Sequence, residues 1–214
     1  TPTKKIRRIL SKQTKLFIVR DKQTRDVFYR FNPIYRVCPA FFCVSHANHR
    51  GDLKKVGFVI QSPNVNRISF PGQQVGVMLQ EIKKVKRLFS NLELICHTET
   101  DYRFIRKYFA GLNICICKSG EDMLRVYKDF DAILSTRLHG CILAASYGIP
   151  SLSLHSSQRL QALERFGIKN SSDVSVESWI KELDIESESK RLLKLKKNEK
   201  EAYLKALNNL EVIF

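Results

Sequence analysis

The sequence has 214 residues, enough to bury a substantial core, and its 43% hydrophobic and 27% charged residues are typical of a globular domain. No apolar run approaches the roughly 20 residues that span a bilayer, and no signal-peptide pattern is present, so neither a membrane-spanning protein nor a secretory precursor is indicated. The formal net charge of +16 favours an anionic partner, such as a phosphorylated small molecule, nucleic acid or an acidic membrane surface, although a basic surface that only aids solubility explains it equally well.

Six cysteines lie mostly in apolar, strand-like runs. A secreted scaffold with three disulfides would usually be much shorter, so we expect reduced core thiols and a cytoplasmic protein. A zinc site can be drawn from Cys38, Cys43, His46 and His49, but their spacing matches no common structural-zinc pattern, and we expect no metal. The first residue is Thr1 rather than methionine, which indicates an excised or processed chain.

The first elements are short. We expect a basic helix, an apolar strand, a second helix and another apolar run at residues 4–15, 16–19, 21–31 and 35–44. In the second helix, Val27, Phe28 and Phe31 have the spacing of core residues, and Asn32 with Pro33 ends it. The polar segment 46–52 is expected to be a linker.

Beyond this linker, short apolar strands alternate with helices. Strands are expected at residues 56–60, 92–96, 113–117, 132–134 and 151–154, and helices at 73–89, 100–110, 120–128 and 140–147. The alternation predicts an α/β fold with a doubly wound parallel sheet covered by helices on both faces. Shorter helices at 160–166 and 176–183 precede a long charged helix at 187–210.

Ligands of open parallel sheets bind at the carboxyl ends of the strands. The run from Ser135 to Gly140 follows one predicted strand and opens a helix of small residues. Arg137 supplies a fork of hydrogen-bond donors and His139 a proton carrier, beside the unpaired N–H groups of a helix start, so a phosphate or carboxylate fits there. A surface arginine followed by a histidine that caps the helix explains the pattern equally well.

Other loops carry weaker signals. His97 follows the strand 92–96, and Arg20 follows the first strand, where an Arg–Asp surface pair with Asp21 is the simpler explanation. The sequence contains no glycine-rich phosphate loop of the Walker or dinucleotide type. It also lacks helix-turn-helix and RNA-binding aromatic patterns, so nucleic acid is not an expected partner.

In combination, these residues resemble the polysaccharide pyruvyltransferase family. The matching segments are Arg20–Asp21, Val37–Phe41, Ile95–His97, Ser119–Asp122 and Asp131–Pro150. They occur in the family's order over roughly residues 16–168, and the last segment is the most specific.

The resemblance implies a fold like that of GT-B glycosyltransferases, with the active site in a cleft between two domains. Residues 1–45 would be a remnant of the N-terminal domain, 46–186 a Rossmann-like donor-binding domain and 187–214 a C-terminal helix. The implied reaction transfers the enolpyruvyl unit of phosphoenolpyruvate onto two hydroxyls of a sugar, which forms a ketal in cell-surface polysaccharide biosynthesis. It requires no cofactor and no metal.

The resemblance also implies roles for particular residues. His139 matches the position best suited to act as general acid, and Arg20 and Arg137 match positions that clamp the carboxylate and phosphate of the donor. The other implied substrate-binding residues are Leu138, His97 and Arg159. The loop carrying Arg159 departs from the family, because an acidic residue commonly precedes that arginine.

Family members have a further N-terminal half that contributes to acceptor binding, and almost none of it is present here. The implied acceptor is a glycan or a lipid-linked sugar, and the basic N-terminal stretch is consistent with peripheral contact at the inner face of the membrane. Two alternatives stay open: a GT-B-type glycosyltransferase that uses a nucleotide sugar, and a non-catalytic anion-binding fragment.

Overall fold

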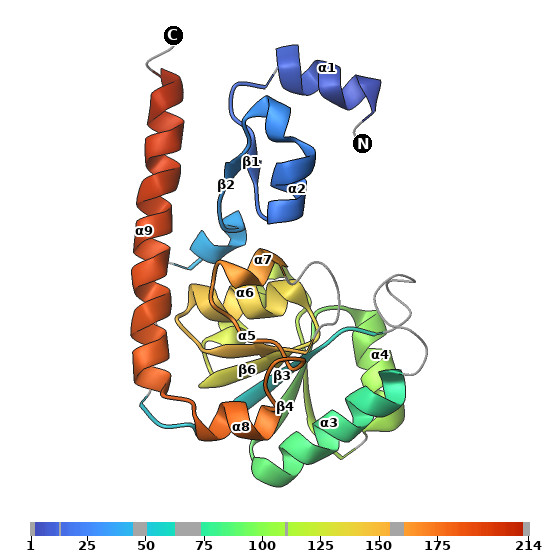
Figure 1. The fold of residues 1–214 in the computed structure, drawn as a ribbon. Helices are drawn as coiled ribbons and strands as arrows, with labels where there is room; N and C mark the ends of the chain where they lie inside the picture. The colour runs from blue at the N-terminus through green and yellow to red at the C-terminus, as the bar shows by residue number, and fades with distance from the viewer. Residues whose placement is uncertain are drawn as a thin grey trace.

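The computed structural model describes residues 3–12, 14–44, 51–62, 74–109, 111–154 and 161–211. Its centre is a five-stranded parallel sheet in the order β5-β4-β3-β6-β7 (Figure 1). The strands are β3 (Val56–Ile60), β4 (Leu92–Cys96), β5 (Asn113–Ile116), β6 (Ala132–Ser135) and β7 (Ser151–Ser153). The chain builds outward from β3 in one direction and then returns to build outward in the other, so a topological switch point lies between β3 and β6.

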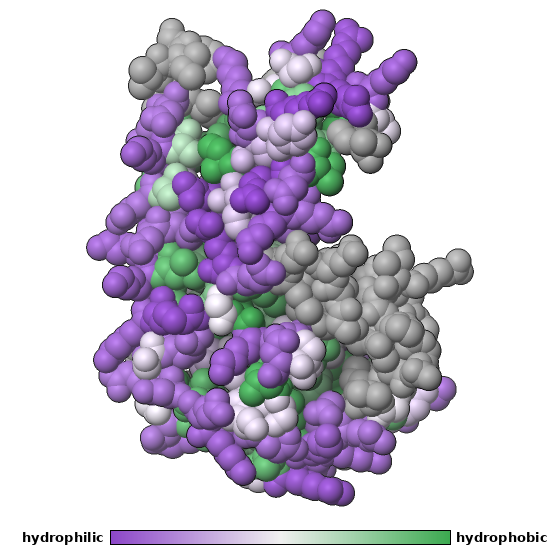
Figure 2. All heavy atoms as spheres, viewed as in Figure 1, coloured by the Kyte–Doolittle hydropathy of each residue, from purple (hydrophilic) through white to green (hydrophobic). Residues whose placement is uncertain are grey.

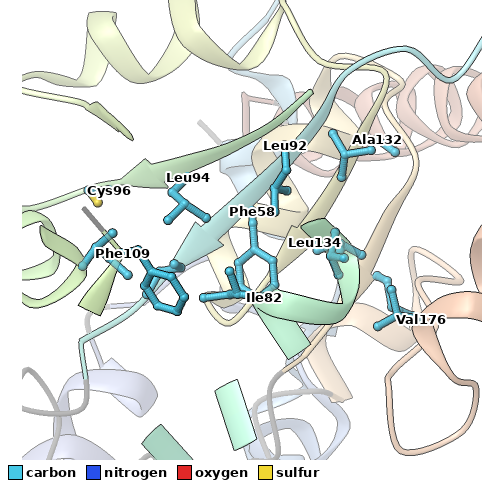
Figure 3. Close-up of a cluster of buried hydrophobic side chains, with 14 of the residues drawn as sticks. Phe58, Ile82, Leu92, Leu94, Cys96, Phe109, Ala132, Leu134 and Val176 are labelled. Atoms are coloured by element: carbon cyan, nitrogen blue, oxygen red, sulfur yellow. The ribbon is translucent and has the colours of Figure 1, made fainter. Parts of the chain in front are cut away.

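Both faces of the sheet are covered by helices. The helices are α3 (Gln74–Leu88), α4 (Glu99–Tyr108), α5 (Gly120–Tyr127), α6 (Leu138–Ser146), α7 (Gln161–Glu164) and α8 (Val176–Lys181). On one face, Phe58 and Leu94 pack with Ile82 of α3 and with α4 and α8 (Figure 3). On the other face, Val59 packs with Tyr127 of α5 and with α6. Every residue of β3 is buried, which explains why its sequence is continuously apolar rather than alternating.

Side-chain caps fix where the helices begin. Thr98 accepts a hydrogen bond from the backbone N–H of Asp101 at the start of α4, and Ser119 accepts one from Asp122 at the start of α5. Each cap satisfies one of the N–H groups that a first turn leaves without a helical partner, and its loss costs about 1 kcal/mol. The caps place the ends of β4 and β5 at the edge of the sheet where ligands of this fold bind.

The N-terminal elements form a separate small layer above this sheet (Figure 1). They are α1 (Lys4–Lys12), β1 (Ile18–Val19), α2 (Lys22–Val27), the 3-10 helix η1 (Tyr29–Phe31), β2 (Ile34–Tyr35) and the 3-10 helix η2 (Pro39–Phe42). The strands β1 and β2 pair in parallel. The layer is anchored by η2, where the fully buried Phe41 packs against Phe166 with ring centroids 4.9 Å apart and joins a hydrophobic cluster with α6 and α9.

The last helix, α9 (Ile185–Glu211), runs from the sheet to the N-terminal layer (Figure 1). Lys196 donates hydrogen bonds to the backbone carbonyls of Val44 and Ser146, each 2.5 Å long. The hydroxyl of Tyr203 donates to the carbonyl of Val37. Hydrophilic side chains cover most of the visible surface of α9 and of the N-terminal layer (Figure 2). The helix therefore ties the N-terminal layer to the sheet through a few specific contacts.

The structure confirms the predicted fold class, and all five predicted strands of the main sheet form. Some details of the prediction were wrong. Val27 is 49% exposed rather than a core residue, because α2 ends there and the next turn is the 3-10 helix η1. Helix α6 begins at Leu138 rather than Gly140, and α1 ends at Lys12 rather than residue 15. Most of the predicted linker lies outside the described residues.

Among the described residues, no helix combines the length and the apolar character needed to cross a membrane.

Candidate active site

Polar groups gather at the carboxyl ends of β3 and β6, on either side of the switch point. Thr136 follows β6, and its hydroxyl accepts the backbone N–H of Gln61, which follows β3, at 2.8 Å. The backbone N–H of Thr136 donates to the carbonyl of Val59 at 3.0 Å. These bonds hold the two loops together before any ligand binds.

Arg137 is held by a buried carboxylate. Its Nη2 lies 2.6 Å from Oδ2 of Asp101, whose side chain is fully buried, while the arginine side chain is 18% exposed. Asp101 also accepts the backbone N–H of Ser62 and the hydroxyl of Thr98, both at 2.7 Å. Arg137 is thus brought to the predicted place, but its charge is compensated inside the protein and its guanidinium is fixed in orientation.

The start of α6 approaches the end of β6 unusually closely. The hydroxyl of Ser135 donates to the carbonyl of Arg137 at 2.8 Å and accepts its backbone N–H at 3.0 Å. A Cβ atom on Gly140 would lie 2.1 Å from that hydroxyl oxygen. Glycine is therefore required there, and the close approach sets the position of His139 in the first turn of the helix.

His97 follows β4, as predicted, and faces inward. Its Nε2 lies 2.8 Å from the hydroxyl of the fully buried Tyr127. Burial and the positive charge of Arg137 lower the pKa of His97 to about 4, so the ring is neutral at neutral pH. A neutral ring bound to a buried tyrosine supports the wall of the site and does not carry a charge toward an anion.

His139 is exposed in the first turn of α6 and lies near the thiol of Cys38; burial raises the pKa of this thiol, whereas His139 lowers it. Arg20 is exposed at the end of β1, and its charge also acts on this thiol. Arg20 and Cys38 line a pocket of about 490 Å³ together with Val37 and other residues of the N-terminal layer and α9. The structure thus brings Arg20 and His139 to the same thiol although they are far apart in the sequence.

The other two predicted residues are Leu138 and Arg159. Leu138 is 8% exposed and belongs to the hydrophobic cluster around Phe41, so its side chain faces the core rather than the site. Arg159 lies outside the described residues. The described residues hold no group of His, Cys, Asp or Glu side chains arranged to bind a metal ion.

Sequence reasoning missed the pairing of Asp101 with Arg137 and that of Cys38 with His139. Asp101 stands next to the predicted His97 loop, but nothing in its local sequence indicates that its carboxylate is buried. Cys38 belongs to the resembling segment 37–41, which was identified without a role for the thiol. Both pairs join elements that are distant along the chain.

The parallel sheet, with polar residues at the carboxyl ends of β3 and β6, defines a class of protein. Structures that resemble this one include S. aureus MnaA with UDP (TM-score 0.55, 13% identity, covering 84% of this chain and 55% of that one). They also include a Streptococcus pneumoniae complex of accessory secretory proteins 1, 2 and 3 (TM-score 0.60, 11% identity, covering 94% of this chain and 44% of that one). A third is S. aureus TarM with fondaparinux, alpha-GlcNAc-glycerol and UDP (TM-score 0.55, 13% identity, covering 97% of this chain and 46% of that one). The chain has the Rossmann-like fold of a GT-B-type domain.

The family follows from the sequence profile of polysaccharide pyruvyl transferase, which matches residues 2–157. The chain belongs to the polysaccharide pyruvyl transferase family, which confirms the predicted resemblance and makes this chain a member of a transferase family. It spans about half the length of the structures it resembles, since it covers 55%, 46% and 44% of the three chains. No curated protein matches its sequence.

Proposed function

We propose that this chain binds phosphoenolpyruvate and contributes the general acid for transfer of a pyruvyl ketal to a sugar. The observation that carries the proposal is the placement of Arg20 and His139 around Cys38, beside the carboxyl edge of the parallel sheet. An exposed guanidinium offers a charge and a fork of donors to a carboxylate or phosphate, and an exposed imidazole at a helix start can deliver a proton.

In the proposed reaction, His139 protonates the methylene carbon of phosphoenolpyruvate. The electron-deficient carbon that results is attacked by one sugar hydroxyl, which loses its proton. A second hydroxyl of the same sugar then displaces phosphate and closes the ring. The proton of the first hydroxyl restores the protonated His139, and the proton of the second leaves with the phosphate. The products are the cyclic ketal and inorganic phosphate, so atoms and charges balance without a cofactor.

Arg137 has a different part in this scheme from Arg20. Its guanidinium is already paired with Asp101, so it contributes mainly by fixing the loop after β3 and the start of α6. Among the described residues, none forms an ion pair with Arg20, whose side chain is exposed, so Arg20 is the better candidate for direct binding of the donor. His97, neutral and bound to Tyr127, would contact the donor as an uncharged group.

Calorimetric titration of the chain with phosphoenolpyruvate tests the donor site. Arg20→Met should weaken binding tenfold or more, about 1.4 kcal/mol or above, because it removes a charge-assisted contact. The matched control is Arg25→Met, which removes the same charge from the exposed α2 nearby and should leave binding within about threefold. Equal affinities for the two variants would refute the assignment of Arg20.

His139→Gln tests the chemical step. This variant should still bind phosphoenolpyruvate, but phosphate release in the presence of a sugar acceptor should fall by at least about a hundredfold, which is the usual contribution of a general acid. Undiminished phosphate release by this variant would remove His139 from its role.

A second candidate function is binding of a nucleotide sugar. It is favoured by the likeness to MnaA and TarM, whose structures contain UDP, although the low identity establishes only a common fold. Tight binding of uridine diphosphate, with no binding of phosphoenolpyruvate, would favour this function over pyruvyl transfer.

We also propose that α1 holds the protein at an anionic membrane surface, where a lipid-linked acceptor would be available. The helix has no acidic residue, and its exposed apolar residues Ile6 and Ile9 lie on one side of it (the basic residues are Lys4, Lys5, Arg7, Arg8 and Lys12). Each basic residue near an anionic surface contributes about 1 kcal/mol at physiological ionic strength.

Sedimentation with phosphatidylserine vesicles tests the membrane contact. A variant with Arg7→Glu and Arg8→Glu should lose at least about tenfold in binding. The control carries the same change in net charge at exposed lysines of α9, with Lys200→Glu and Lys205→Glu, and should retain most of the binding. Equal loss in both variants, or binding that does not depend on salt, would contradict a specific role for α1.

A further inference from the structure

Three consecutive residues at the end of α7, which lies between the main sheet and the N-terminal layer (Figure 1), each contact that layer. They do so through an ion pair, a cation–π contact and an aromatic contact (Glu164 with Lys22, Arg165 with Tyr35 and Phe166 with Phe41). The ion pair is half exposed at both ends and contributes little, and the aromatic contact belongs to the apolar cluster that anchors the layer. Of the three contacts, the one made by Arg165 reaches a strand, β2, and that strand borders the candidate site.

Arg165 is also fixed by α9. Its Nε donates a hydrogen bond to Oε1 of Glu199 at 2.9 Å, and its Nη2 donates to the same oxygen. The side chain of Glu199 is 6% exposed and that of Arg165 is 27% exposed. A buried carboxylate that has lost its hydration favours a guanidinium that stays in place. Arg165 therefore has a defined position relative to α9 while it contacts β2.

The ring beside Arg165 belongs to the strand pair that carries Arg20. Tyr35 of β2 lies opposite Val19 of β1, and the backbone N–H of Arg36 donates to the carbonyl of Val19 at 2.9 Å. Arg20 follows Val19 directly and lines the pocket of about 490 Å³. A continuous series of contacts thus runs from α9 through Arg165 and Tyr35 to Arg20.

Arg165 contacts the ring of Tyr35, with its guanidinium carbon 5.1 Å from the ring centre. The hydroxyl oxygen of Tyr35 is buried and has no hydrogen-bond partner within the described ranges. The guanidinium of Arg25 lies 5.9 Å from the centre of the same ring, but Arg25 is in α2 and so belongs to the same layer as Tyr35. Of these two guanidinium contacts, the one made by Arg165 joins the layer to the rest of the chain.

We propose that Arg165 is a positioning residue for the donor site: it holds β2 against α9, and through the paired strand β1 it places Arg20 for donor binding. The effect on donor binding rests on the proposed function, whereas the fixing of the strand pair does not. Arg165 is not among the residues that line the pocket, so it acts on the donor through Arg20 and not by contact.

Hydrogen exchange followed by mass spectrometry tests the fixing of the strand pair. In Arg165→Gln, the amides of β1 and β2 should exchange at least about tenfold faster, while those of β3 and β6 in the main sheet keep their rates. Arg165→Lys keeps a positive charge near Glu199 and Tyr35 and should restore most of the protection. Unchanged exchange of β1 and β2 in Arg165→Gln would overturn the proposal.

Tyr35 offers a second variant that leaves Glu199 paired, and it keeps the test valid even where Arg165→Gln disturbs folding. Tyr35→Leu removes the ring and should produce the same faster exchange in β1 and β2. Tyr35→Phe removes only the unpaired hydroxyl and should leave the exchange rates unchanged.

The matched control for the guanidinium is Arg25→Met, which removes the contact to the same ring from within the layer. It should leave the exchange rates of β1 and β2 within about twofold. Equal acceleration in Arg25→Met and Arg165→Gln would show that the contact from outside the layer has no special role, and the proposal would fail.

Calorimetric titration with phosphoenolpyruvate tests the step from the strand pair to the donor. Arg165→Gln should weaken binding at least about threefold, as expected of a residue that acts through others. In an Arg20→Met background, the same substitution should change the affinity by less than about twofold, because the group that it positions is gone. Additive losses in the double variant would contradict the proposal, since a general loss of structure would weaken binding with or without Arg20.

The two measurements separate this proposal from the proposed function. If Arg20→Met leaves the affinity for phosphoenolpyruvate unchanged while Arg165→Gln still accelerates exchange in β1 and β2, the donor site is wrong and the fixing of the strand pair stands. If Arg20→Met weakens binding and Arg165→Gln does not, the donor site stands and Arg165 is not its positioning residue.

Discussion

The most informative structural perturbation is Asp101→Asn, which removes one charge and almost no volume. Oδ1 of Asp101 accepts the backbone N–H of Ser62, and Oδ2 accepts both the Thr98 hydroxyl and Nη2 of Arg137. An asparagine has one accepting oxygen and one donating nitrogen. In either orientation of the amide, a donor therefore faces a donor inside a fully buried site.

The magnitude follows from this geometry. Removing one partner of a buried ion pair costs about 3–5 kcal/mol, because an uncompensated charge is left behind. The remaining charge, that of Arg137, is 18% exposed and gains some hydration, so we expect the low end, a loss of about 3 kcal/mol in the free energy of unfolding. For a domain whose stability is about 5–15 kcal/mol, this is a large fraction.

Urea unfolding followed by the fluorescence of Trp179, the single tryptophan, measures this loss, since Trp179 is buried in the core on the α8 side of the sheet. The matched control is Glu99→Gln on the same helix. It removes a carboxylate that pairs at 3.1 Å with Arg103 in solvent, and should cost only about 0.5 kcal/mol. A difference between the two variants smaller than about 1 kcal/mol would refute the argument that the Asp101–Arg137 pair organises this edge.

Three further predictions concern the surroundings of the site. Gly140→Ala should lower the unfolding free energy by about 1–3 kcal/mol, because its Cβ would meet the Ser135 hydroxyl, and adding Ser135→Ala should recover part of this loss; an additive double variant would contradict the clash. His97 should titrate near pH 4 by NMR. Because this pKa lies below the value of 6.5 in the unfolded chain, the free energy of unfolding should fall as the pH drops from about 6.5 to about 4, by at most about 1.4 kcal/mol per pH unit. His97→Gln should remove this pH dependence. A titration midpoint of His97 near pH 6.5 would refute the prediction. Lys196→Met should loosen α9 against Val44 and Ser146 and accelerate proteolysis of the N-terminal layer, whereas Lys197→Met, at an exposed neighbour, should not. Equal rates would show that the two hydrogen bonds are dispensable.

Much of the fold could be predicted because the strands of a doubly wound sheet are buried on both faces. The run from Val56 to Ile60 is continuously apolar for that reason and could be located within one residue. The predicted start of α6 at Gly140 is two residues late, and a glycine, which normally weakens a helix, gives no local sign that it lies inside one. The glycine is inside the first turn, where packing against Ser135 outweighs its low helix propensity.

The candidate site was only partly predictable. Arg137 and His139 could be placed at the sheet edge, because strand and helix order determine where that loop lies. The charge state of the site could not be predicted, because it depends on the pairing of Arg137 with Asp101, which is 36 residues away in the sequence. Long-range pairs of this kind have no local pattern, and the same holds for the thiol of Cys38 beside His139.

The proposed site combines parts of the chain that do not form one continuous folding unit. Arg20 and Cys38 come from the N-terminal layer, His139 comes from α6, and Tyr203 of α9 binds the carbonyl of Val37, immediately before Cys38. The distance between Arg20 and His139 is therefore set by how α9 and η2 hold the layer against α6. A substitution in α9 that lies far from the pocket should then alter the affinity for the donor without contacting it, because it moves Arg20 relative to His139.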